Sequence, residues 1–216
     1  MAIAFDAGSG STSGTLSTTV AHTCSGSNLF LMVGQWVNGP GDISTGVTYN
    51  GVAMSLLTKV NNVGSAANQW IYIYGMLNPP TGSHNIVGSC SSAQTYVVGA
   101  SYTGVNQSAL PSIVGSNAVS STSVSVSLTT TVDNSWLAGF SYTSSTPPTA
   151  GSNTTLRQSS NGYSGLWIID SNGPKTPTGS YNLNLTQSPS GFMGMVACAI
   201  APSASITVNS NFLAFM

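Results

Sequence analysis

The chain has 216 residues and a formal net charge of −1, and only 3% of its residues are charged. An ordinary globular domain carries about 25% charged residues. The only basic side chains are Lys59, Arg157 and Lys175, which are too few to neutralise a nucleic-acid backbone. We therefore expect no nucleic-acid partner. A chain of this length buries roughly 70% of its unfolded surface, so one domain can form a core without disulfides or metals.

No segment predicts a membrane span. The longest apolar runs, at 29–33 and 195–200, fall far short of the roughly 20 residues that a spanning helix needs. The start of the sequence lacks the basic region and the long apolar region of a signal peptide. We therefore expect synthesis in a cytoplasm.

Alternation of apolar and polar residues dominates the first half, which predicts strands rather than helices. The expected strands are 2–6, 15–23, 28–37, 46–49, 52–59, 68–77, 84–90 and 95–103. Asn50-Gly51 is the strongest hairpin signal in the chain, because this pair favours a type I′ turn. Residues 68–77 carry apolar or aromatic side chains on both faces. Such a strand is expected in the centre of a sandwich or at an interface.

The second half continues the same pattern, with expected strands at 121–131, 135–143, 165–170, 181–187 and 191–201. In residues 121–131, Val124, Val126 and Leu128 alternate with serines, which indicates a strand with one buried face and one solvent-exposed face. Loops rich in Gly, Pro and Asn separate the strands.

About a dozen short strands with no helical window predict an all-β fold, an antiparallel β-sandwich or barrel. No internal repeat is evident, so we expect one domain over residues 1–203. Residues 204–216 form an apolar segment at the end of the sequence, and such a segment promotes aggregation if it stays exposed to water. We expect it to form an arm or an added strand, on its own sheet or on a neighbour's. The candidate oligomer contacts in it are Ile206, Val208, Phe212, Leu213 and Phe215.

A series of turn and core segments carries a family resemblance over about residues 3–202. The segments are 5–6 (FD), 22–28 (HTCSGSN), 47–52 (VTYNGV) with Met54, 74–85 (YGMLNPPTGSHN) and 101–105 (SYTGV). The series is similar to bacterial and bacteriophage β-sandwich domains of concanavalin-like, jelly-roll character. The resemblance implies a jelly-roll-like sandwich on a cell surface or a virion, and it supplies no catalytic residue.

Catalytic and metal-binding patterns are weak. The four aspartates, Asp6, Asp42, Asp133 and Asp170, are scattered, whereas glycoside hydrolysis needs a carboxylate pair about 5–10 Å apart. The chain has no G-x-S-x-G elbow and no phosphate-binding loop. We therefore expect no enzyme and no cofactor. A structural calcium site built from Asp42 or Asp170 stays open.

Three cysteines, Cys24, Cys90 and Cys198, are widely spaced and outside any C-x-x-C pattern. They are either three small buried hydrophobes or one disulfide with one free thiol. A metal site is not expected, because His22 and His84 are the only histidines available as further ligands.

The tryptophans are the remaining candidates for ligand binding. Trp36, Trp70, Trp136 and Trp167 would stack on sugar rings if they are exposed, but each lies in an expected strand with apolar neighbours. Large aromatic side chains in such strands usually fill the core.

The low charge is the most informative feature. A net charge near zero promotes association, and subunit interfaces are depleted of Lys, Glu and Asp. We therefore expect a structural, self-assembling virion protein of a bacteriophage, such as a head decoration, fibre or tail-surface subunit. Its expected partners are further copies of itself, for example in a trimer, and other virion proteins. The alternative is a carbohydrate-binding or adhesive module that recognises host surface glycans, located on an extracellular surface.

Overall fold

The computed structural model describes residues 1–61, 69–145, 147–163 and 165–204. These residues form antiparallel strands and no α-helix, which confirms the predicted all-β sandwich. They contain no helix that could cross a membrane.

The strands form three sheets. In spatial order, the first contains β1 (Ala4–Gly10), β9 (Gln94–Thr103), β3 (Phe30–Asn38), β7 (Gln69–Leu77) and β6 (Ser55–Asn61). The second contains β10 (Val114–Thr129), β15 (Ser180–Ile200), β11 (Trp136–Thr143), β14 (Leu166–Asp170) and β13 (Thr155–Ser159), with β12 (Thr149–Ala150) paired to β15. The third contains β2 (Ser17–Cys24), β8 (Gly82–Cys90), β4 (Ser44–Tyr49) and β5 (Val52–Ala53).

The first and third sheets together form a jelly roll. Their strand orders, β1-β9-β3-β7 and β2-β8-β4-β5, are those of the two four-stranded sheets of that fold. The Asn50-Gly51 hairpin between β4 and β5 is confirmed, because both residues have positive φ, at 50° and 76°, as a type I′ turn requires.

The second sheet folds over itself to form a second jelly roll. β10 has a bulge between Ser121 and Ser123, and its two halves pair with opposite halves of β15. The order of one layer is therefore β10-β15-β11-β14, and the other layer contains the second half of β10, the first half of β15 and β12. The expected strands 181–187 and 191–201 are thus two halves of one long strand.

The expectation of no internal repeat is wrong. Apart from β5, the strands of residues 1–105 recur in the same order and register from Val114 onward, and the bulge between Leu56 and Thr58 recurs between Leu156 and Gln158. The repeat leaves one clear trace in the sequence, PTGSHN at 80–85 against PTGSYN at 177–182. Elsewhere the equivalent positions have diverged, so a comparison of residue types alone does not reveal them.

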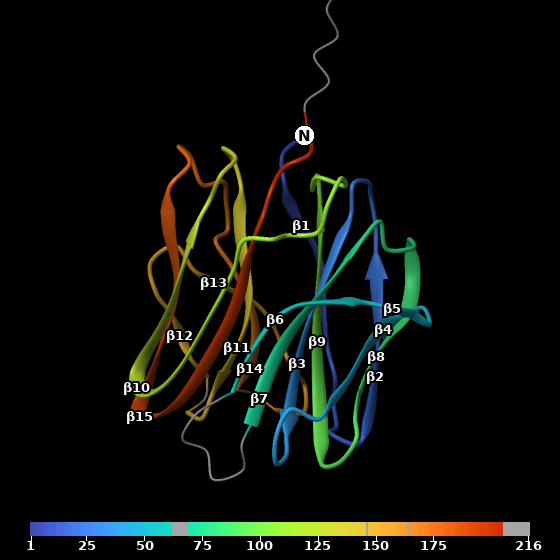
Figure 1. Cartoon of the computed structure of the whole chain (residues 1–216), viewed down its shortest axis with the longest axis vertical. Coiled ribbons are helices and arrows are strands. Elements are labelled where there is room, and N and C mark those ends of the chain that lie inside the picture. Colours follow the sequence, from blue (N-terminus) through green and yellow to red (C-terminus); the bar gives the residue numbers. More distant parts are fainter. Residues whose placement is uncertain (62–68, 146, 164, 205–216) are drawn as a thin grey trace, which may run out of the picture.

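The two repeats pack face to face in a stack of four layers, with the first repeat on the right in Figure 1 and the second on the left. One core fills the centre between the repeats, and one further core lies within each sandwich. This arrangement explains the apolar faces of β7, because Ile71 and Ile73 face the central core while Tyr72 and Tyr74 face the third sheet.

The packing of the repeats is pseudo-two-fold. β6 lies against β10 and β15, and its counterpart β13 lies reciprocally against β1 and β9. Near the axis, equivalent positions meet each other, as in an isologous dimer. Trp36 stacks on its equivalent Tyr142, with ring centroids 5.9 Å apart and an interplanar angle of 8°. Gly34 lies against the ring of its equivalent, Phe140.

We predict that Gly34→Ala destabilises the chain by about 3 kcal/mol, because a Cβ at position 34 would overlap the Phe140 ring. Adding Phe140→Leu should restore part of that loss by making room at the axis. Urea unfolding of both single variants and the double variant measures the coupling. Purely additive effects would contradict direct packing between the two positions.

Candidate functional site

The few charged side chains are mostly engaged inside the chain. Asp170 is fully buried, and Lys175 is 9% exposed with its Nζ 6.0 Å from the centre of the Tyr181 ring. On the surface, Lys59 forms an ion pair with Asp42, and the Asp133 carboxylate accepts a hydrogen bond from the Thr178 amide at 2.7 Å. Little unpaired charge therefore reaches the outer surface that the structure describes.

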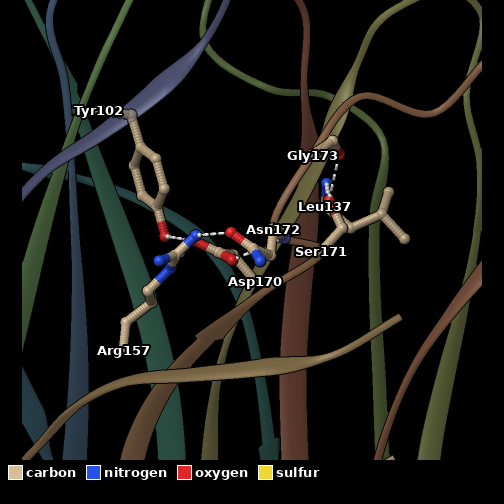
Figure 2. Close-up of polar contacts among 7 residues, drawn as sticks. All are labelled: Tyr102, Leu137, Arg157, Asp170, Ser171, Asn172 and Gly173. Carbon is tan, nitrogen blue, oxygen red and sulfur yellow. Dashed lines mark hydrogen bonds and ion pairs between the residues drawn. The ribbon is translucent and has the colours of Figure 1, made fainter. Parts of the chain in front are cut away.

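One buried ion pair lies where the two repeats meet (Figure 2). The Arg157 Nε donates to Asp170 Oδ2 at 2.7 Å, and its Nη2 donates to Asn172 Oδ1 at 2.7 Å. The Tyr102 hydroxyl, from the first repeat, also donates to Asp170 Oδ2 at 3.3 Å. The Arg157 guanidinium lies 4.9 Å from the centre of the Phe5 ring, which also belongs to the first repeat. The pair therefore links the repeats.

The remaining oxygen of Asp170 is also occupied. Its Oδ1 accepts a hydrogen bond from the Asn172 amide at 2.8 Å. Burial and the nearby carboxylate raise the pKa of Tyr102 well above its ordinary value, so its hydroxyl stays a donor. With its acceptors engaged by the protein, Asp170 serves as a structural anchor.

At the positions equivalent to this ion pair, the first repeat has no charged side chains. Strand register makes Gly75 the equivalent of Asp170 and Leu57 the equivalent of Arg157. Leu57 and Phe30 pack over Gly75, just as Arg157 lies over Trp136. The ion pair is therefore one of two solutions that this fold accepts at this position.

A second polar cluster lies inside the first repeat, where a bulge in β1 between Phe5 and Ala7 accommodates Asp6. The Asp6 carboxylate accepts hydrogen bonds from the Ser25 amide at 2.9 Å and from the Ser101 hydroxyl at 2.7 Å. The Ser101 hydroxyl also lies 3.1 Å from His22 Nε2, and Ser9 Oγ lies 3.0 Å from His22 Nδ1. A chain of hydrogen bonds thus connects Asp6 to Ser9 through the buried imidazole.

The electrostatics of this cluster do not favour catalysis. Burial lowers the pKa of His22 to about 4, with only partial compensation from Asp6. Burial also acts to raise the pKa of Asp6, but hydrogen bonds from Ser101 and Ser25 outweigh it and lower that pKa. A general base works best with a pKa near the operating pH, and Asp6 reaches His22 only through Ser101. The cluster is not a Ser-His-Asp triad.

The second repeat replaces this polar cluster with apolar side chains. Leu128 stands at the position of His22, Ala199 at that of Ser101 and Gly115 at that of Ser9. Leu128 and Ala199 are buried in the core of the second sandwich. The fold does not require hydrogen bonds at these positions.

The tryptophans differ in burial. Trp36 and Trp136 are 2% and 8% exposed in the central core, so they do not meet the condition of exposure for sugar stacking. Trp167 and Trp70 are partly buried. The Trp70 ring stacks on Tyr72 with centroids 6.2 Å apart, and Lys59 Nζ lies 5.6 Å from the Trp70 centroid.

The three cysteines are free and buried, which confirms the first of the two alternatives. Burial raises the pKa of all three thiols, and that of Cys198 to about 12. They are therefore protonated and unreactive at neutral pH. Within the described ranges, no three His, Cys, Asp or Glu side chains come together as a metal site.

The predicted oligomer contacts of the tail, Ile206, Val208, Phe212, Leu213 and Phe215, lie outside the described residues. No family model, curated protein or solved structure matches the chain. Its fold and side-chain chemistry are therefore the basis on which its function is inferred.

We predict that Arg157→Leu destabilises the chain by about 3–5 kcal/mol, because it leaves Asp170 buried without its cation. The double variant Arg157→Leu/Asp170→Gly should recover most of this loss, since it copies the apolar solution of the first repeat. Urea unfolding at neutral pH measures both. A double variant as unstable as the sum of the two single changes would contradict this role.

We predict that stability falls by about 3 kcal/mol as the pH drops from 6.5 to about 4, because unfolded His22 binds a proton that the folded chain resists. Asp6, whose folded pKa is lowered, loses its contribution only below its ordinary value of 3.8. The variant His22→Leu/Ser101→Ala copies the second repeat and should flatten this pH window. Denaturation series across pH test it, and an unchanged slope in the variant would refute the assignment.

Proposed function

We propose that this chain is a structural, self-assembling virion protein of a bacteriophage, as a head decoration, fibre or tail-surface subunit. The observation that carries the proposal is the nearly uncharged outer surface of a double jelly roll. In the described residues, ion pairs and hydrogen bonds engage Asp6, Asp42, Lys59, Arg157 and Asp170. The remaining polar surface consists mainly of Ser, Thr and Asn.

A surface of this kind favours permanent contacts between subunits. The outward face of β10 illustrates it, because exposed Ser123, Ser125 and Ser127 alternate there with buried Val124 and Val126. Hydroxyl groups can enter an interface with a smaller desolvation cost than charged side chains. Such a surface suits subunits that stay together.

Because the surface carries few charges, assembly should also depend little on the salt concentration. Salt screens interactions between exposed charges, and Lys59 with Asp42 is the one exposed ion pair among the described residues. A particle built from such subunits would persist across the range of salt that it meets outside a cell. Its partners would be further copies of the chain, for example in a trimer, and other virion proteins.

A second candidate is a glycan-binding module, and Trp70 is the observation that favours it. This half-buried ring lies beside Lys59 and near Asp42, a combination of aromatic and charged groups that sugars can engage. Its neighbours Tyr72 and Tyr74 are 1% and 5% exposed, so the patch is small. Trp70→Phe, which keeps the packing, should abolish binding on a glycan array if this candidate is correct.

We predict a discrete multimer or filament at micromolar concentration, with a mass that does not change between low salt and about 1 M NaCl, where the Debye length is about 3 Å. Size-exclusion chromatography with light scattering measures this mass. A monomer under all these conditions would refute self-assembly.

A further inference from the structure

We propose that an apolar groove beside β5 receives the C-terminal segment, residues 206–216, of a second copy of the chain as an added strand. The inference rests on the proposed self-assembly and names its contact. It follows from a difference in the number of strands between the two sheets of the first repeat. The first sheet has five strands and the third has four, of which the outermost, β5, spans only Val52–Ala53.

Because the third sheet has fewer strands, part of the first sheet has no strand packed over it. Leu56 of β6 pairs with Tyr74 of β7, so both lie on the sheet face that carries Met76 and is turned toward the third sheet. Beyond β5, this face borders a groove of about 450 Å³. The groove is lined mainly by apolar residues, among them Val52, Ala53, Met76, Leu77, Pro80 and Leu110.

Of the six large hydrophobic side chains that are exposed among the described residues, two lie together at this edge. Val52 is 58% exposed and Leu56 is 45% exposed, on a chain whose surface is otherwise rich in Ser, Thr and Asn. The second repeat is less apolar at this place, because Ser171 stands there at the position of Met76, while Leu156 keeps the position of Leu56 apolar. A contiguous exposed apolar surface of this kind indicates a binding face.

The backbone of β5 is open on the same side. Among the described strands, β5 pairs only with β4, through Tyr49↔Val52 and Thr48↔Ala53. An edge strand with unpaired backbone groups and apolar flanks is a template for strand addition. An incoming strand would extend the third sheet and cover the exposed Leu56 of β6 and the half-buried Met76 of β7.

The C-terminal segment has the chemistry of such a strand. Residues 206–216 (ITVNSNFLAFM) contain no charged side chain, no proline and no glycine, and they alternate at Ile206 and Val208 before an apolar end. Twelve residues follow Ala204, so an extended segment spans about 40 Å, enough to reach a neighbouring molecule. A head-to-tail contact of this type closes into rings or continues as a filament.

Mixing two complementary variants tests the contact. One variant ends at Ala204 and keeps its groove, and the other carries Val52→Asp and keeps its tail. Each alone should be monomeric, because its contact with a second copy is broken. An equimolar mixture should form a heterodimer, since one intact tail meets one intact groove. Val132→Asp, at an apolar residue that is 45% exposed outside the groove, is the matched control and should assemble as the wild type does.

The possible results distinguish the tail-to-groove contact from self-assembly in general. Light scattering that shows monomers alone and a heterodimer on mixing supports the tail-to-groove contact. Wild-type assembly that survives both changes overturns the groove assignment and leaves self-assembly intact. Monomeric variants that do not pair on mixing also overturn it. A monomeric wild type overturns the proposed function and the groove contact together.

Discussion

The face-to-face burial of the two inner sheets is the constraint on which the rest of the molecule depends. Each inner sheet has apolar side chains on both faces, so neither sandwich could stand alone without exposing one face to water. The pseudo-two-fold axis resolves this by letting equivalent strands cover each other. Near this axis the equivalent positions of the two repeats carry different residues that pack against each other. The Phe140 ring lies against Gly34, and Trp36 stacks on Tyr142.

Local patterns predicted most of the strands and the Asn50-Gly51 turn, because alternation and turn chemistry are encoded in neighbouring residues, but they missed the first half of β10, β12 and β13. The duplication was not predictable in this way, since it lies in strand order and register. The Arg157–Asp170 pair was missed for a related reason. It depends on the hairpin of β13 and β14, and residues 155–159 carry no clear strand pattern. The contact of His22 with Ser101 joins residues far apart in sequence, which periodicity cannot reveal.

Comparison of the repeats distinguishes what the fold needs from what it tolerates. Where one repeat has Arg157 and Asp170, the other has Leu57 and Gly75, so charge is dispensable at that place. The same reasoning applies to the edge near β5, where Ser171 of the second repeat stands at the position of Met76 and Leu156 at that of Leu56. Sparse charge, the double sandwich and the exposed apolar edge near β5 are the features on which the proposal of a self-assembling subunit rests.

Differential scanning calorimetry of the full chain in dilute solution tests the shared core most directly. If one core binds both repeats, both should unfold together in a single cooperative transition. Two separate transitions, one for each repeat, would show that the sandwiches fold independently and would contradict the account.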